Sequence, residues 1–352
     1  MLIPTRRRRF TLALIAISAI AMALCCVKEF ATDGHRRAPK PSTARPGAAT
    51  SMLRENSALA QQHFYVDPHG RAATQAAQWQ ADGHSQQAAL LRKIADRPVA
   101  DWVTDGPIPV AERVGALVGR AEAAGQLPVL VAYNIPDRDC GGHSSGGAAS
   151  AARYGEWIRG FARGIGNRPA VVILEPDAIA HSLQGCAESG ERLAVLHDAV
   201  TVLKGNSSTS VYLDAGNPGW ITDTRQLALA LRRAGIAEAD GFALNVANFY
   251  TTSDNITFGN GLSDALGGHI HFVVDTSRNG DGPAPSDDTS RWCNPPGRAL
   301  GAAPTTETGQ PLVDAFLWVK RPGESDGSCR SGEPPAGQWW PEYALGLAAR
   351  AS

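Results

Sequence analysis

Short, nearly uninterrupted runs of apolar residues recur along the chain from about residue 60 onward. The clearest runs are 127–134, 170–177, 209–216, 241–246, 269–277 and 314–320. Continuous apolar runs of this length are typical of strands that are buried on both faces of a sheet. Between them the apolar positions take helical spacing, as in 111–125 and 224–235. Alternating strands and helices predict an α/β fold with a parallel β-core, most simply a (β/α) barrel in a single domain.

Polar side chains gather at the carboxyl ends of these runs. In chain order they are Tyr133 and Asp139, Glu175 and Asp177, Asp214, Asn245 and Asn248, Asp275, and finally Lys320, Glu324 and Asp326. The carboxyl ends of parallel strands meet on one face, and barrel enzymes build their active sites on that face. The pattern therefore predicts an enzyme whose active site contains several carboxylates.

The start of the chain has the composition of an export signal. A run of arginines precedes a charge-free apolar segment at 11–27, and the Ala-Met-Ala at 21–23 offers a cleavage site. The apolar segment is close to the shortest that spans a bilayer, so an uncleaved membrane tether is the alternative. We expect residues 1–27 to be a signal peptide or anchor, 28–58 a disordered linker, and 59–352 the catalytic domain of a secreted or cell-envelope protein.

Charge and motifs narrow the function further. The 33 Lys and Arg residues nearly balance the 34 Asp and Glu residues, which argues against a nucleic-acid partner. We expect no serine nucleophile on a strand-to-helix elbow of the Gly-x-Ser-x-Gly kind, and the sequence has no P-loop. The stretch 275–282 resembles a calcium loop, but Ser286 stands where such a loop needs a glutamate. We expect no metal, no cofactor and no obligatory protein partner, and we expect a monomer.

An exported protein is expected to form disulfides. Four cysteines follow the predicted signal, namely Cys140, Cys186, Cys293 and Cys329. None lies in a Cys-x-x-Cys pair, so a zinc site is not indicated, and the spacing leaves three pairings open. The carboxylates and the eight tryptophans favour glycoside hydrolysis. That reaction needs a proton donor, a group that activates water, and flat aromatic faces for the sugar rings.

Several motifs carry a family resemblance. VAYNIPDRDCGGHSSGG and VVILEPDAIA resemble the two signature segments of glycoside hydrolase family 6, the cellulases and cellobiohydrolases. YLDAG, NVANF, DTSRNGDGP, WCNPPGRALG and LWVKRPGESDG extend the similarity in the same order from about residue 64 to the C-terminus. The chain is most similar to the bacterial endoglucanases. The resemblance implies a distorted, incomplete (β/α) barrel that hydrolyses β-1,4-glucan with inversion at the anomeric carbon.

The resemblance also implies catalytic roles. Asp177 matches the general acid, whose pKa must be raised, and the nearby charge of Asp139 would raise it. Arg138 would help to keep Asp139 ionised. Asp326 matches the proposed base, which acts directly or through a chain of water, and Ser145 matches the residue that holds the attacking water. In addition, Tyr133 matches the tyrosine that presses on the distorted sugar.

Further positions match binding and supporting residues of the family. The sugar-stacking and sugar-binding set comprises Trp102, Trp220, Trp292, Asn217, Asn245, Lys320 and Glu324. Asn217 replaces a histidine that is common in the family, which weakens one sugar contact. Asp214 either supports the surroundings of the acid or holds strand-end backbone.

The disulfide pairing and the mode of attack also follow from the resemblance. It implies the pairs Cys140–Cys186 and Cys293–Cys329. Only a short segment follows Cys329, whereas a long one roofs the tunnel of cellobiohydrolases, so we expect an open cleft and an endoglucanase. The alternatives are a cellobiohydrolase of the same family and, in a different class, a β-glucan-binding protein that has lost catalysis.

Overall fold

The computed structural model describes residues 59–351 except 187–188 and 286–289. The predicted signal peptide and linker therefore lie outside the described residues. Among the residues that it does describe, no helix combines the length and apolar character needed to cross a membrane.

A seven-stranded parallel sheet forms the centre of the fold, and its strands follow one another in chain order. Their bounds are β1 Asp101–Val103, β2 Val129–Ala132, β3 Ala170–Leu174, β4 Thr209–Asp214, β5 Gly241–Leu244, β6 His271–Asp275 and β7 Val313–Leu317. The predicted apolar runs contain β2 to β6, and the last run overlaps β7 apart from Val313. Each run extends beyond its strand into the loop that follows. The strand β1 was not predicted, because three residues are too short to show a pattern.

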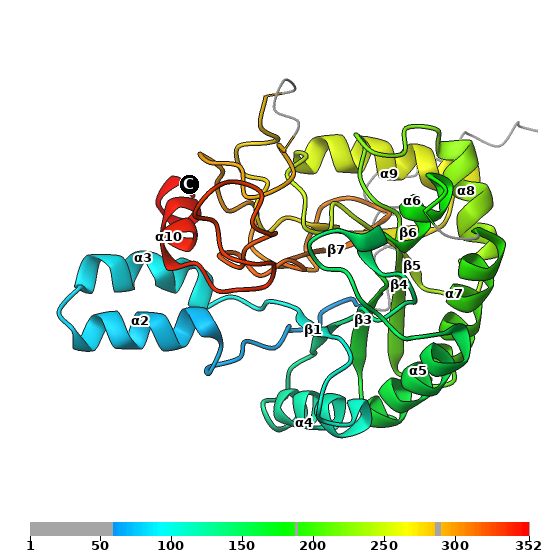
Figure 1. The fold of residues 1–352 in the computed structure, drawn as a ribbon, viewed down its shortest axis with the longest axis horizontal. Coiled ribbons are helices and arrows are strands. Elements are labelled where there is room, and N and C mark those ends of the chain that lie inside the picture. The colour runs from blue at the N-terminus through cyan, green and yellow to red at the C-terminus, as the bar shows by residue number, and fades with distance from the viewer. Residues whose placement is uncertain (1–58, 187–188, 286–289, 352) are drawn as a thin grey trace, which may run out of the picture. The chain divides into compact units, whose positions relative to one another are not determined.

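Helices cover the outer face of this curled sheet (Figure 1). Their bounds are α2 Arg71–Ala81, α3 Ser85–Ala95, α4 Val110–Ala123, α5 Ala151–Ile165, α6 Ala178–Leu183, α7 Ser189–Lys204, α8 Thr224–Arg233, α9 Thr252–Leu266 and α10 Pro341–Arg350, with a short 3-10 turn at Asp139–Gly141. The helices α2 and α3 form a hairpin that packs with α10 to one side of the sheet.

Alternate residues of the strands enter two different cores, as the pleat of a strand requires. Leu130 and Val172 point outward and pack with the helices in one large apolar cluster. Val131 and Ile173 point to the inside of the curl, where they meet Tyr212 in a second cluster. Because both faces are covered by apolar side chains, the strands carry continuous apolar runs, and this is the signal that made them predictable.

The sheet curls into a half-barrel that does not close. No strand ladder joins its edge strands β1 and β7. A few bonds bridge the seam instead: Ala100 N–H donates to the Trp318 carbonyl at 2.9 Å, and the Trp102 indole N–H donates to the Val319 carbonyl at 2.8 Å. The predicted incomplete barrel is therefore confirmed.

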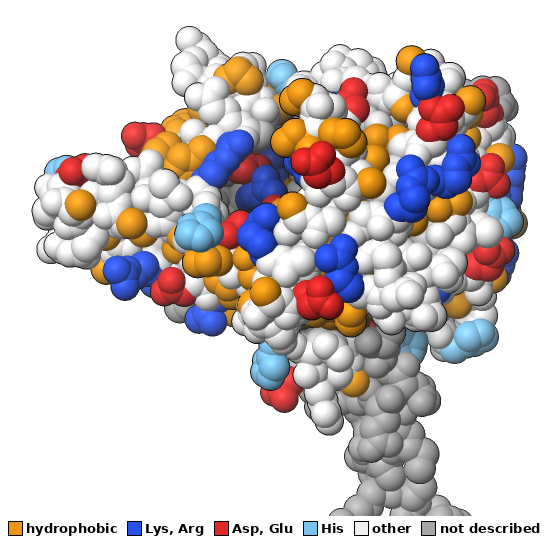
Figure 2. Space-filling view, turned by 90° about the horizontal axis from the view of Figure 1, so that it is seen from below, with side chains coloured by type: hydrophobic (Ala, Val, Ile, Leu, Met, Phe, Trp, Pro, Cys, Tyr) orange, Lys and Arg blue, Asp and Glu red, His pale blue; other side chains and the backbone are white. Residues whose placement is uncertain are grey.

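Both expected disulfides, Cys140–Cys186 and Cys293–Cys329, are formed. Each fixes a long loop on the face where the strands end. Figure 2 shows the surface hollowed beside the lobe that contains α2 and α3, with basic and acidic side chains gathered in the hollow.

Candidate active site

Several strands end in a left-handed backbone turn. Glu175 and Asp177 after β3 have φ of 48° and 70°, and Asn245 and Ala247 after β5 have φ of 66° and 56°. Such positions cost on the order of 1–3 kcal/mol each for residues other than glycine, and neighbouring contacts must hold them in place. Their clustering at the strand ends marks this face as a functional site.

Glu175 stabilises the loop that follows β2. Its buried carboxylate accepts hydrogen bonds from the backbone N–H groups of Asn134 and Ile135 at 2.9–3.0 Å. Burial raises the pKa of Glu175 to about 7, although these two backbone donors act in the opposite direction. Glu175 therefore holds backbone, and it is Asp177, two residues later, that lines the cleft.

The Asp177 carboxyl lies in surroundings that favour its protonated form. Burial is the largest cause of its raised pKa, followed by the charges of Asp214 and Asp139, while Lys320 acts in the opposite direction. The sequence had pointed to Asp139 as the main cause, but the structure ranks burial and Asp214 above it. A carboxylic acid that stays protonated in this way can donate a proton near neutral pH.

Asp214 combines the two roles left open by the sequence. Its Oδ1 atom accepts hydrogen bonds from the backbone N–H groups of Asp177 at 3.0 Å and Gly216 at 3.1 Å. Burial raises its pKa to about 7, against the effect of these two donors. Asp214 therefore holds strand-end backbone and also acts electrostatically on the neighbouring acid.

The loop of Asp139 differs in one respect from the expectation. Asp139 Oδ2 accepts from the Ser144 N–H at 2.6 Å. Arg138 donates to the carbonyl oxygens of Tyr133, Ser144 and Ser145, and its recorded ion pair is with Asp105 at 4.0 Å. Arg138 thus folds the loop rather than pairing with Asp139.

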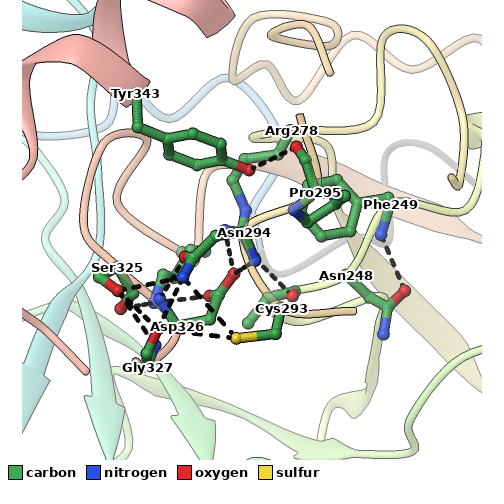
Figure 3. A network of polar contacts seen from close by, with 12 residues as sticks. Asn248, Phe249, Arg278, Cys293, Asn294, Pro295, Ser325, Asp326, Gly327 and Tyr343 are labelled. Atoms are coloured by element: carbon green, nitrogen blue, oxygen red, sulfur yellow. Dashed lines mark hydrogen bonds and ion pairs between the residues drawn. The ribbon is translucent and has the colours of Figure 1, made fainter. Parts of the chain in front are cut away.

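Asp326 is buried in a polar network (Figure 3). Its Oδ2 atom accepts from Arg278 Nη1 at 2.7 Å and from Asn294 N–H at 2.9 Å, and Lys320 Nζ lies 3.0 Å from Oδ1. Burial would raise the pKa of Asp326, but the charges of Arg278 and Lys320 outweigh it and lower the pKa. Asp326 is therefore an ionised carboxylate and an intrinsically weak base.

The sequence analysis assigned no role to Arg278, although its segment was compared with a calcium loop and contributes a motif to the family resemblance. Arg278 is completely buried, donates to the Ala247 carbonyl, and its guanidinium lies 4.3 Å from the Phe249 ring centre. A sequence signal did exist, because an arginine directly after the apolar run 269–277 needs a partner if it is buried with that run. The partner, Asp326, lies 48 positions away and could not be identified from the pattern.

A cleft of about 860 Å³ brings most of the predicted residues together. Those that line it are Asp139, Asp177, Asp326, Ser145, Tyr133, Trp102, Trp220, Trp292, Asn217, Lys320, Glu324 and Arg138. The Trp102 ring meets Tyr133 edge-on at 5.0 Å, and the Trp220 ring meets His181 in the same way at 5.0 Å. Burial, followed by the charges of Asp177 and Asp139, raises the pKa of Tyr133, which therefore remains a neutral hydroxyl.

Asn245 is the predicted binding residue that the structure places elsewhere. It is fully buried and is not among the residues that line the cleft. Its side-chain amide donates to the carbonyls of Tyr250 and Asp275 and accepts from the Tyr250 N–H. Its contacts are therefore with backbone, and any effect on substrate passes through Tyr250, which does line the cleft.

Two clusters have the composition of metal sites but not the chemistry. Cys140 and Cys186 lie close to His181, and Cys293 and Cys329 lie close to Glu333. All four cysteines are oxidised to disulfides, so they offer no thiolate ligand.

Two loops that carry catalytic candidates touch each other. His143 follows Asp139 in one loop, and its Nε2 atom lies 3.3 Å from Cys329 Sγ in the loop of Asp326. A Cβ atom at Gly327 would lie 2.4 Å from the His143 ring, so this close approach requires glycine. The contact was not evident from the sequence, since it joins residues 186 positions apart.

A parallel half-barrel that places an acid with a raised pKa among other carboxyl groups, in a cleft lined with tryptophans, is the architecture of a glycoside hydrolase. The chain belongs to glycosyl hydrolases family 6, whose family model matches residues 59–351. The family predicted from the sequence motifs is thereby confirmed.

Named relatives agree with this assignment. Endoglucanase 1 of Streptomyces halstedii is 44% identical over 291 residues, which are 80% of this chain and 87% of that protein. Endoglucanase A of Cellulomonas fimi is 45% identical over 293 residues, which are 82% of this chain and 61% of that protein. The solved structure of the endoglucanase Cel6 from Mycobacterium tuberculosis, in complex with methyl-cellobiosyl-4-deoxy-4-thio-β-D-cellobioside, matches with a TM-score of 0.78 and 44% identity, covering 83% of this chain and 98% of that one.

Proposed function

We propose that this protein is an endo-β-1,4-glucanase that hydrolyses internal bonds of a β-1,4-glucan with inversion of the anomeric configuration. The observation that carries the proposal is the raised pKa of Asp177 in a cleft lined with tryptophans. Asp177 donates its proton to the oxygen of the leaving sugar, and water attacks the opposite face of the ring.

The charges around the acid give the remaining residues their proposed roles. Asp139 and Asp214 keep Asp177 protonated until the glycosidic oxygen accepts the proton. Asp326 stays ionised beside Lys320, so its negative charge stabilises the positive charge that develops on the sugar ring. Because a carboxylate with a lowered pKa is a weak base, the proton of the attacking water passes through a hydrogen-bonded chain that includes the Ser145 hydroxyl to bulk solvent, and solvent returns a proton to Asp177 for the next turnover.

Binding of the glucan rests on the aromatic side chains. Trp102, Trp220 and Trp292 offer ring faces for sugar stacking, and Tyr133 packs beside the acid. Lys320, Glu324 and Asn217 supply polar contacts to sugar hydroxyls. Asn245 contributes indirectly, by holding the backbone of Tyr250.

Internal cleavage is supported by the short segment 330–340, which connects Cys329 to α10 and offers little chain to cover the cleft. The names of the relatives at 42–45% identity support the same mode. The test is the viscosity of soluble carboxymethylcellulose during digestion. An endoglucanase lowers viscosity steeply for each reducing end formed, whereas a cellobiohydrolase releases cellobiose with little loss of viscosity.

We also propose that the protein works outside the cytoplasm as a secreted monomer. The two disulfides support an oxidising compartment, and the predicted signal supplies the route. Sedimentation of the mature protein tests the monomer, and fractionation of the producing cells tests the location.

A further inference from the structure

Arg291 is a cation in the cleft that none of the roles above uses. It lines the cleft next to Trp292, whose side chain is 47% exposed. Arg291 Nη2 donates to the Tyr250 hydroxyl at 3.0 Å, and its guanidinium lies 6.0 Å from the Tyr250 ring centre. Within the described ranges no ion pair is recorded between Arg291 and a carboxylate. Among the described residues its guanidinium is therefore oriented by a neutral hydroxyl and forms no ion pair.

Tyr250 is held firmly enough to orient this arginine. Its carbonyl accepts hydrogen bonds from the side chains of Asn245, Asn255 and Asn279 at 3.0–3.1 Å, and its N–H donates to Asn245 Oδ1. The Tyr250 hydroxyl also packs against Gly219, where an added Cβ would lie 1.7 Å from the hydroxyl oxygen. These contacts fix the Tyr250 hydroxyl beside Gly219, which directly precedes Trp220 in the chain.

The side chains that line the cleft include more basic than acidic groups, although Asp105 and Asp101, just outside the lining, pair with Arg138 and Arg321. Five Lys and Arg side chains line it, namely Arg71, Arg138, Arg291, Lys320 and Arg321. Four acidic side chains line it, namely Asp139, Asp177, Glu324 and Asp326, and the raised pKa of Asp177 favours its neutral form. Glu324 and Asp326 already pair with Arg321 and Lys320. The whole chain carries a formal charge of −1, so this surplus belongs to the cleft in particular.

A neutral glucan does not need the charge of this guanidinium, because a sugar hydroxyl accepts a hydrogen bond from an uncharged donor as well. A guanidinium presents paired N–H donors that match a carboxylate, and the adjacent indole positions a sugar ring within reach of it. We propose that Arg291, oriented by Tyr250, makes the cleft select β-1,4-glucan chains whose sugars carry carboxylate substituents. The inference rests on the proposed glucanase function and names the substrate class of that same site.

The test compares two soluble glucans of matched chain length, carboxymethylcellulose and the neutral hydroxyethylcellulose. The measured quantity is the ratio of kcat/KM on the first to kcat/KM on the second. For Arg291→Gln we expect this ratio to fall about three- to tenfold, the range of one partly exposed, charge-assisted contact. Arg291→Lys keeps the charge without the paired donors and should fall between the wild type and Arg291→Gln. Tyr250→Phe, which releases the guanidinium, should also lower the ratio.

Ionic strength and a matched variant control the test. Raising salt from about 0.01 M to about 1 M should lower the wild-type ratio toward that of Arg291→Gln, because the charge is screened. Arg233→Gln removes the same charge from the exposed face of α8, outside the cleft, and should leave the ratio unchanged.

The inference is overturned if Arg291→Gln leaves the ratio unchanged, or if it lowers kcat/KM equally on both glucans, which would make Arg291 a general sugar contact. If the wild type hydrolysed neither glucan, the proposed function itself would fail. A variant that hydrolyses both glucans without preferring carboxymethylcellulose is therefore distinguishable from a protein that has no glucanase activity.

Discussion

The backbone N–H of Asp177 donates a hydrogen bond to Oδ1 of Asp214 at 3.0 Å, while Oδ2 of Asp214 is buried without a hydrogen-bond partner in the described structure. The acid is thus tied through its own backbone to the carboxyl group whose charge opposes its ionisation. Asp214 itself has a pKa raised to about 7, and the pKa of Asp177 is raised as well, so the two carboxyl groups titrate as an interacting pair.

This relationship predicts the pH dependence of Asp214→Asn. Activity is present below the pKa of Asp177 and is lost as the pH rises through it, because the acid must be protonated. The asparagine keeps the Oδ1 acceptor but removes the charge that raises the pKa of Asp177. The alkaline limb of the kcat/KM profile should therefore move to lower pH. Asp264→Asn, on the exposed face of α9, is the control, and a limb that stayed in place or moved upward would contradict the coupling.

For Asp177→Asn we expect kcat to fall by roughly 10²- to 10⁴-fold, the usual contribution of a general acid. Binding of cello-oligosaccharides and the melting temperature should change little, because the amide fills the same space. Single-turnover kinetics and calorimetry separate these effects. Retention of more than about a tenth of wild-type kcat, a barrier change under roughly 1.4 kcal/mol, would remove Asp177 from the role of acid.

Reduction of the two disulfides should destabilise the protein. Cys140–Cys186 and Cys293–Cys329 close loops of 46 and 36 residues, each worth about 4 kcal/mol in the chain-entropy description. We expect the midpoint of thermal unfolding to fall by on the order of 10 °C in reductant. Mass mapping of the unreduced protein should recover the two linked peptides, and four free thiols would overturn the pairing.

The stereochemistry of the product is a separate prediction. No residue is assigned as a covalent nucleophile, so water attacks directly and a β-1,4 bond should release the α-anomer first. Proton NMR of a fresh cellohexaose digest resolves the two anomers before mutarotation mixes them. An initial β-anomer would mean a glycosyl-enzyme intermediate and would remove the proposed roles of Asp139 and Asp326.

A cluster at the opposite end of the sheet predicts a pH dependence of stability. His271 Nδ1 lies 2.7 Å from Asp314 Oδ1, and the Tyr212 hydroxyl donates to Asp314 Oδ2 at 2.7 Å. The hydrogen bond to Asp314 raises the pKa of His271, against the effect of burial. A raised pKa in the folded state contributes stability that is fully present below the unfolded pKa of about 6.5 and is lost as the pH rises through the folded value.

His271→Gln should therefore reduce the free energy of unfolding more at acidic than at alkaline pH. Urea titrations at several pH values measure this difference. His197→Gln, at an exposed histidine that bonds to Glu238, is the matched control. An equal loss at all pH values would show that the His271 contact is insensitive to its charge.

The sequence predicted the elements that repeat a strong pattern. Runs such as 170–177 are largely apolar because one face of the sheet packs against helices and the other faces the apolar interior of the curled sheet. Such a strand can be predicted without tertiary information. The strand β1 could not be predicted in this way. Its three residues, Asp101–Val103, join the sheet only because β2 lies beside them.

The residues of the candidate active site also fall into those that local motifs predict and those whose contacts depend on the fold. Asp177 and Asp139 lie in motifs that can be read locally, and both line the cleft. The partner of Asp326, Arg278, lies 48 positions away, and the sequence pattern does not show how these two distant loops fold together. For Asn245, the family resemblance implied a sugar contact, whereas in the folded chain its amide hydrogen-bonds to the backbone carbonyls of Tyr250 and Asp275.

The open seam between β1 and β7 bears on how a polymer can be handled at all. In a closed barrel every strand pairs on both sides, and the strand ends enclose a pit that suits a small molecule. Here the two edge strands do not pair as a ladder, and the cleft runs over the gap, with Trp102 on one edge and Arg321 beyond the other. The missing strand pairing therefore leaves an open-ended cleft in place of a closed cavity. A long chain can lie through it with both of its ends outside the protein, which is the geometric requirement for cutting in the middle.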